Sequence, residues 1–91
     1  MKQIADIFEQ IFNKPELKGF LDEGKVLSTW PQIVGVQIAQ LSKPLSFKDG
    51  TLFVRVDSPA WRNELSMMRS HIKKKINESL GSEIVQSIIL R

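Results

Sequence analysis

The side chains of this sequence that could do chemistry are cations spaced along one segment, and their pattern is typical of binding rather than catalysis. Residues 59–80 have the apolar spacing of a helix. At about 100° per residue, Arg62, Arg69 and Lys73 fall within about 40° of one another beside the apolar stripe of that helix. Glu64 is the only acid on this segment before its last turn. Aligned cations with so few acids predict a stripe that contacts phosphate groups.

The distribution of charge along the chain favours the same interpretation. The net charge is +3; the first 50 residues hold six lysines against six acids, and residues 51–91 hold seven Lys or Arg against four acids. Arg55, on a neighbouring predicted strand, joins the stripe if its face of the sheet is open. The sequence leaves open a solvated helix face as the alternative. For Lys74 and Lys75 the alternative is favourable charge near a helix C-terminus.

Catalytic groups are almost absent. His71 is the only histidine, it lies on the side of its helix away from the apolar stripe, and the chain has no cysteine. The adjacent acids Asp22 and Glu23 do not face each other on a helix. No glycine-rich nucleotide loop, serine-hydrolase elbow or His-Glu-x-x-His zinc motif occurs. The sequence therefore predicts a protein that is not an enzyme, with no cofactor and no metal site.

The two tryptophans are candidates for stacking on bases, but both fall on apolar helical stripes. Trp30 shares its stripe with Val26 and Ile33, and Trp61 shares its stripe with Leu65. Large aromatic side chains on such stripes are typical of a core. We therefore expect both tryptophans to be buried, with Trp61 as a core anchor at the start of the last helix.

The helices that must position these residues are indicated by apolar periodicity and by breaking residues. Residues 2–13 have helical spacing that ends before Pro15, and a main helix is expected near residues 24–39 with Pro31 in its first turns or at a kink. A last helix begins with Ser58 as N-cap and Pro59 at its first position, and stops at Gly81.

The strands follow from period-two alternation. Residues 45–48 and 51–57 place Leu45, Phe47, Leu52, Val54 and Val56 on one face, which predicts a half-buried antiparallel hairpin. The two residues between these segments, 49 and 50, are Asp and Gly, types that accept positive φ in a tight turn. Residues 83–91 are rich in β-branched types and predict a final strand, interior to the sheet or covered by a helix.

Length and composition limit the remaining choices. Ninety-one residues predict a single α+β domain over 1–91, with a helical extension over 1–22 and a core over 24–91. No apolar run approaches the roughly 18 residues of a membrane span, and the N-terminus lacks the pattern of a signal sequence. The absence of cysteine suits a reducing compartment. We therefore expect a cytoplasmic protein that does not enter a membrane.

An ordered series of residue types over about two-thirds of the chain resembles the DciA family of bacterial proteins, which are associated with the replicative DNA helicase. The shared types are Trp30, Ile33, Val34, Gly35, Ile38 and Ala39, then Ser42 and Pro44, then Asp49, Gly50, Thr51, Leu52, Val54, Val56, Ser58, Ala60, Trp61, Glu64 and Leu65, then Ile76, Asn77 and Gly81. The resemblance implies a K-homology-like domain, in the order helix, strand, strand, helix, strand. It also implies that the protein binds DNA and helps to load the helicase.

The chain departs from true K-homology domains in one respect. The G-x-x-G loop that clamps nucleotides in those domains is absent, because the glycines stand at positions 19, 24, 35, 50 and 81. Nucleic acid must then use another surface, and Arg55, Arg62, Arg69 and Lys73 are the candidates. The expected function is a non-enzymatic module of DNA replication that contacts the replicative helicase and weakly binds single-stranded DNA or RNA. The alternatives are an RNA-binding K-homology-like domain and a protein-interaction module without affinity for nucleic acid. The sequence does not indicate an oligomeric state.

Overall fold

The computed structural model describes residues 15–91, and within them four helical segments and three strands follow one another. The helix expected over residues 2–13 lies outside the described residues. In chain order the elements are α2 (Pro15–Val34), α3 (Val36–Leu41), β1 (Ser42–Lys48), β2 (Thr51–Val56), α4 (Pro59–Met67), α5 (Arg69–Leu80) and β3 (Ser87–Leu90). This order confirms the predicted α+β, K-homology-like fold.

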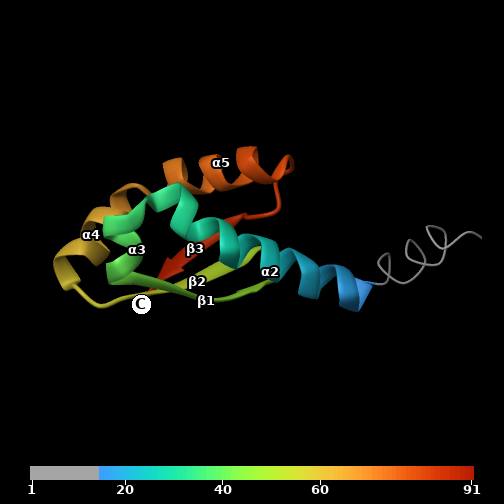
Figure 1. Cartoon of the computed structure of the whole chain (residues 1–91), viewed down its shortest axis with the longest axis horizontal. Coiled ribbons are helices and arrows are strands. Elements are labelled where there is room, and N and C mark those ends of the chain that lie inside the picture. The colour runs from blue at the N-terminus through green and yellow to red at the C-terminus, as the bar shows by residue number, and fades with distance from the viewer. Residues whose placement is uncertain (1–14) are drawn as a thin grey trace, which may run out of the picture.

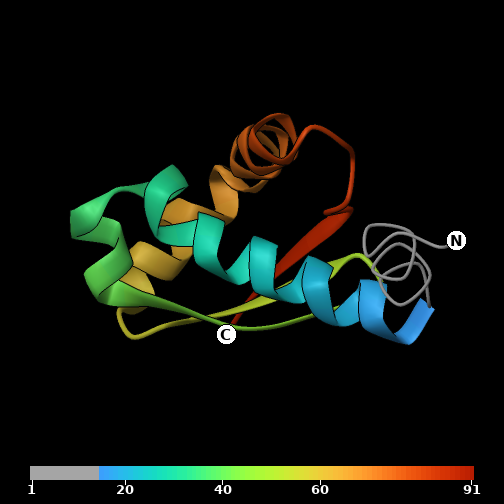
Figure 2. The same ribbon diagram turned by 45° about the vertical axis from the view of Figure 1, so that its right-hand side comes forward.

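The three strands form one sheet in the order β1-β2-β3, with the helices on one side of it (Figure 1). The β1 and β2 strands are antiparallel, whereas β2 and β3 are parallel, so α4 and α5 together make the crossover that parallel pairing requires. Turning the molecule by 45° leaves the sheet below the helices (Figure 2). The core lies between these layers and consists of Val26, Trp30, Phe47, Leu52, Val54, Val56, Leu65, Ile72, Ile76, Val85 and Ile88.

The hairpin turn has the predicted geometry. Asp49 has φ 52° and Gly50 has φ 81°, as a two-residue turn with positive φ at both positions requires. The carbonyl oxygen of Gly50 also accepts hydrogen bonds from the N–H groups of Gln86 (2.8 Å) and Ser87 (3.1 Å). The turn therefore anchors the start of β3 as well as joining β1 to β2.

One residue of the hairpin departs from the expected alternation. The register between β1 and β2 shifts between Pro44 and Ser46, so Leu45 is an extra residue in β1, and it is 47% exposed. A β-bulge of this kind turns a side chain away from its regular face. Leu45 was therefore wrongly expected on the buried face, while Phe47 on the same strand is buried as predicted.

The main helix begins and ends earlier than the expected range of residues 24–39. It begins at Pro15, where a proline costs little because the first N–H groups of a helix have no partner in that helix. It passes through Gly24 and Pro31 and ends before Gly35, whose φ of 90° is open to glycine but strained for other residues. The expected boundary between the extension and the core, at residues 22–24, therefore falls inside α2.

Trp30 fixes α2 and α3 onto the sheet. Its side chain is fully buried, as predicted, and its indole Nε1–H donates to Ser42 Oγ at 3.0 Å. The Ser42 hydroxyl in turn donates to the carbonyl oxygen of Ile38 at 2.7 Å. The polar edge of the largest core side chain is thus satisfied inside the protein, as burial requires.

The segment expected to be one helix over residues 59–80 is interrupted at Met68. The start and end are as predicted: the Trp61 N–H donates to Ser58 Oγ (3.3 Å), and Gly81 caps the C-terminus in the left-handed conformation. At Met68, however, the backbone N–H bonds to the carbonyl of Leu65, three residues back, and the helix restarts at Arg69.

The interruption coincides with a shift in which residues are buried. Leu65, Ile72 and Ile76 are buried, whereas Trp61 and Met68 are each 39% exposed. The expectation that Trp61 anchors the core is therefore wrong. Leu65 is the only residue of α4 that is buried, so the exposed indole lies in the first turn of a helix that contributes little to the core.

The final strand is shorter than expected and lies at the edge of the sheet. It covers Ser87–Leu90 within the predicted 83–91. Of the two predicted placements, interior to the sheet or covered by a helix, the second is found, because β3 is an edge strand that packs against α4 and α5. Just before β3, the Asn77 side chain bonds both backbone groups of Val85: Nδ2–H donates to its carbonyl, and Oδ1 accepts from its N–H, each at 2.8 Å. Asn77 therefore holds the segment leading to β3 against α5.

Candidate nucleic-acid interface

Three of the four predicted cations lie along one shallow groove between the α4–α5 helices and the β3 edge. One part of the groove contains Arg62 and Arg69, and the adjoining part contains Arg69 and Lys73. Arg69 lines both parts, so the two hollows adjoin at this residue. The structure therefore brings Arg62, Arg69 and Lys73 together, although the helix that was to align them is broken at Met68.

The described residues that line this groove include three cations and no acid. The full lining is Pro59, Arg62, Asn63, Ser66, Arg69, Ser70, Lys73, Gln86, Ser87, Ile88, Ile89 and Leu90. A concave surface with a single sign of charge raises the local concentration of oppositely charged ligands. The groove therefore suits an anionic chain.

Arg62 is less exposed than the sequence predicted. Its side chain is only partly exposed, Nη2 donates to the carbonyl oxygen of Val56 at 2.9 Å, and Nε is buried without a hydrogen-bond partner. The guanidinium thus joins α4 to the end of β2 and keeps only part of its donor capacity for a ligand. The expectation of a fully exposed stripe is wrong at this residue.

Arg69 is better placed to meet a ligand. It is exposed, and its Nε–H donates to the carbonyl oxygen of Ser66 at 3.2 Å, an acceptor that the interruption at Met68 leaves at the end of α4. This bond orients the side chain while the two terminal nitrogens of the guanidinium remain for a ligand. Arg69 is also the first residue of α5, where the positive end of the helix dipole favours anions.

Arg55 does not lie in the groove. It projects from β2 on the face of the sheet opposite to the core, and its Nε lies 3.3 Å from Oδ1 of Asp57, with both side chains more than two-thirds exposed. The face is open, as the prediction for Arg55 required, but it is a different surface from that of Arg69 and Lys73. Alternation along β2 could have separated these residues from the sequence alone.

The open edge of β3 is a feature of the groove that the sequence did not indicate. The backbone of Arg91 bonds to β2 through both its N–H, to the Val54 carbonyl, and its carbonyl, from the Val56 N–H. Because strand residues alternate, the N–H and carbonyl groups of Leu90 and Ile88 point away from β2, toward the groove side. Leu90, which is only partly buried, therefore offers backbone hydrogen-bonding groups next to the cations of the groove, whereas Ile88 is buried.

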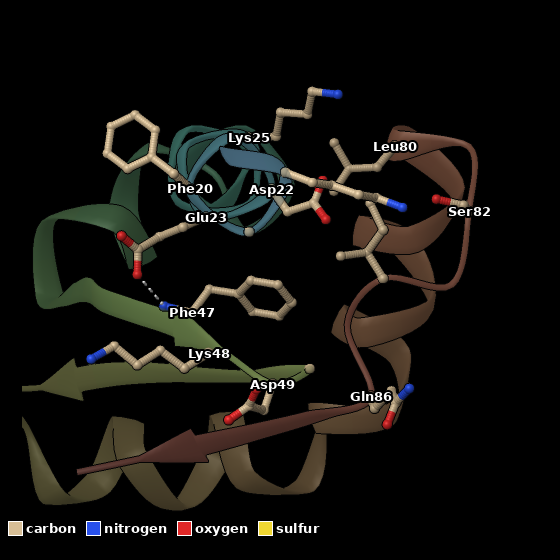
Figure 3. Close-up of a pocket in the computed structure, with 14 residues that line it drawn as sticks. Phe20, Asp22, Glu23, Lys25, Phe47, Lys48, Asp49, Leu80, Ser82 and Gln86 are labelled. Atoms are coloured by element: carbon tan, nitrogen blue, oxygen red, sulfur yellow. Dashed lines mark hydrogen bonds between the residues drawn. The ribbon is translucent and has the colours of Figure 1, made fainter. Parts of the chain in front are cut away.

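A second groove, at the other end of the molecule, has a different character (Figure 3). It lies between the first half of α2, the hairpin turn and the segment before β3. Glu23 crosses it to accept a hydrogen bond from the Phe47 N–H at 3.1 Å. Its charged lining residues are three lysines and three acids: Lys18, Lys25, Lys48, Asp22, Glu23 and Asp49. The balance of charge makes this groove a poor site for a polyanion.

Neither a metal cluster nor a membrane-spanning helix is found within residues 15–91. No group of three or more His, Asp or Glu side chains in that part of the chain is placed to hold a metal ion. Among the same residues, no helix combines the length and the apolar character that crossing a bilayer requires.

Comparison with known proteins gives a family. Residues 3–90 match the family described as "Dna[CI] antecedent, DciA". A UPF0232 protein of Mycobacterium ulcerans is 39% identical over 85 residues, which cover 93% of this chain and 46% of that protein. A UPF0232 protein of Rhodococcus jostii is 41% identical over 68 residues, which cover 75% of this chain and 36% of that protein. A UPF0232 protein of Mycobacterium tuberculosis is 38% identical over 66 residues, which cover 72% of this chain and 35% of that protein.

The chain thus spans less than half the length of these curated relatives. The family match nevertheless extends over nearly all of it, including every helix and strand that frames the cationic groove. The chain belongs to the DciA family.

Proposed function

We propose that this protein is a non-enzymatic binding module of bacterial DNA replication, which contacts the replicative helicase and holds single-stranded nucleic acid weakly in the α4–α5/β3 groove. The observation that carries the nucleic-acid part is the lining of that groove, with Arg62, Arg69 and Lys73 and no acid. Membership of the DciA family supports the role in replication.

The groove favours a weak, sequence-independent mode of binding. Cations that meet phosphates position a strand without reading its bases. Arg69 and Lys73 lie on α5 one helical turn apart, with Arg62 preceding them on α4, so few phosphates can be engaged at once. With about three contacts, the logarithm of the affinity for single strands should fall against the logarithm of salt concentration with a slope of about −2.

The contact with the helicase rests on the family rather than on a surface of this chain. The family description names an antecedent of other replication proteins. Association with the replicative helicase is what the resemblance to the DciA family implies. Two alternatives make different predictions. A K-homology-like RNA-binding domain prefers an RNA strand to a DNA strand of equal sequence, and a protein-interaction module binds neither.

The nucleic-acid part is tested by titrating labelled single-stranded DNA at low salt. Arg69→Glu/Lys73→Glu should reduce affinity at least tenfold, because it reverses two of the three groove charges. Lys74→Glu/Lys75→Glu is the matched control, since it makes the same change in net charge on the same helix. Both lysines are exposed and do not line this groove. Equal losses in the two variants would show that net charge, and not the groove, is responsible.

The helicase part is tested by purifying the full chain from its own cells and asking whether the replicative helicase accompanies it. Treatment of the lysate with nuclease separates direct contact from bridging by nucleic acid. Loss of the helicase after nuclease treatment contradicts direct contact. Parallel titrations with DNA and RNA strands of the same sequence decide between the proposal and the RNA-binding alternative.

A further inference from the structure

The face of the sheet opposite to the helices is uncovered within residues 15–91. The core residues of β1 and β2, such as Phe47 and Val54, point toward the helices, so their neighbours along each strand point away from them. In Figure 1 and Figure 2 no described helix passes beneath the sheet. The residues of this outer face that matter here are Lys43, Thr51, Phe53, Arg55, Ile89 and Arg91.

Three cations form a row across one end of this outer face. Lys43 on β1 pairs with Arg55 on β2, and the backbone of Arg91 bonds to the residues on either side of Arg55. Like charges directly opposite each other on neighbouring strands destabilise a sheet. Asp57 pairs with Arg55 at 3.3 Å, but both side chains are largely exposed, so this pair offsets little. The row thus opposes folding, and a bound anion would relieve it.

An aromatic ring lies next to the row of cations. Phe53 is the neighbour of Arg55 on the same face of β2, and it pairs with Ile89 on β3. The Arg91 guanidinium carbon lies 4.9 Å from the centre of the Phe53 ring. Aromatic rings and guanidinium planes are the two surfaces on which proteins stack unpaired bases. A ring placed here contributes nothing to the core, which lies on the other face of the sheet.

We propose that the outer face is a second contact surface for single-stranded nucleic acid, with phosphates at Lys43, Arg55 and Arg91 and one base stacked on Phe53. This inference rests on the proposed function for its class of ligand, and it adds a site where a base stacks on an aromatic ring. The groove of Arg69 and Lys73 contacts phosphates only.

The two surfaces adjoin at one corner of the molecule. Arg62 lines the groove together with Arg69, and it also lines a hollow at the end of the sheet that contains Arg55, Asp57 and Arg91. A strand held in the groove therefore ends close to the outer face.

The test compares two probes of equal length: a 15-nucleotide thymidine oligomer and the same backbone without bases. Wild-type protein should prefer the oligomer with bases by about fivefold or more, the lower end of what a base–aromatic stack contributes. Phe53→Leu should remove this preference while keeping the affinity for the abasic backbone, and Thr51→Ala, on the same face of β2 and outside the groove, should keep the preference. Arg55→Glu/Arg91→Glu should lower the affinity for both probes. Thermal melting confirms that each variant is folded.

Either of two results overturns the proposal: equal affinity of wild type for the two probes, or a preference that survives in Phe53→Leu. The second result would assign stacking to another ring, such as exposed Trp61. The groove variant Arg69→Glu/Lys73→Glu separates this inference from the proposed function. This variant should lower the affinity for both probes and leave the ratio of the two affinities unchanged. Loss of groove binding is therefore measured by the affinities, and loss of base stacking by their ratio.

Discussion

Arg62 has both a structural and a surface role. Its Nη2 donates a hydrogen bond to the Val56 carbonyl, and its side chain lines two hollows on the surface. Removing the side chain leaves that carbonyl, on a buried residue, without its partner. Arg62→Ala should therefore lower the free energy of unfolding by about 1–3 kcal/mol. Arg69→Ala, in which an exposed side chain is removed, should change it by less than about 0.5 kcal/mol. Urea unfolding of the two variants measures the difference, and equal effects would contradict the role given to Arg62.

The two tryptophans differ in burial, so replacing each by alanine should change the free energy of unfolding by different amounts. Trp30 is fully buried and hydrogen-bonded to Ser42, so Trp30→Ala should cost about 3–5 kcal/mol and unfold much of a domain this small. Trp61 is 39% exposed, and Trp61→Ala should cost only about 1 kcal/mol. Melting curves followed by circular dichroism compare them. A Trp61→Ala protein that melts as low as Trp30→Ala would show that the indole packs more tightly than its exposure indicates.

At the scale of elements, the hairpin turn is the position where backbone conformation matters most. Gly50 has φ 81°, and a Cβ built there lies 3.2 Å from the side chain of Gln86. Gly50→Val should destabilise the protein by about 1–3 kcal/mol, mainly through backbone strain, because the Gln86 side chain can move aside. Gly50→Asn is the control, since asparagine accepts positive φ more readily. Denaturant titration should place Asn between wild type and Val, and the reverse order would contradict strain as the cause.

The elements also mark the limits of what local sequence can predict. The hairpin turn, the Ser58 cap, the Gly81 stop and most core positions follow from short-range rules, and the structure confirms them. The interruption at Met68 carries no glycine or proline, so nothing local marks it. The exposure of Trp61 could not be predicted for the same reason. On one continuous helix, Trp61 falls on the same apolar stripe as buried Leu65.

Other features could not be predicted from the sequence because they depend on pairing between strands that are distant in the chain. The bulge at Leu45 depends on how β1 pairs with β2, and the edge position of β3 depends on the parallel crossover, which β-branched composition does not reveal. For the candidate site, the spacing of Arg62, Arg69 and Lys73 predicted the right neighbours. It could not show that the β3 edge completes their groove, or that Arg55 lies on the other face of the sheet.

At the scale of the whole molecule, ligand binding and stability are linked. A ligand that binds only the folded state raises its stability by an amount set by the ratio of ligand concentration to Kd. At low salt, single-stranded DNA in large excess over Kd should therefore raise the melting temperature by a few degrees. At roughly 0.5 M salt, where phosphate contacts are screened, the shift should vanish. Differential scanning fluorimetry with and without oligonucleotide measures this, and a shift that is independent of salt would contradict binding through phosphates.

The paired hydrogen bonds from Asn77 to Val85 determine how this molecule opens. Val85 lies outside any strand, yet its amide proton is held by a side chain of α5 and the residue is 1% exposed. Local opening of β3 can therefore occur without exposing this amide, since the Asn77 bond does not depend on the sheet. Exchange with deuterium at Val85 should be as slow as at Ile76 inside α5 and much slower than at Gln86, next in the chain. The α5 helix and the segment that leads to β3 should then exchange as one cooperative unit.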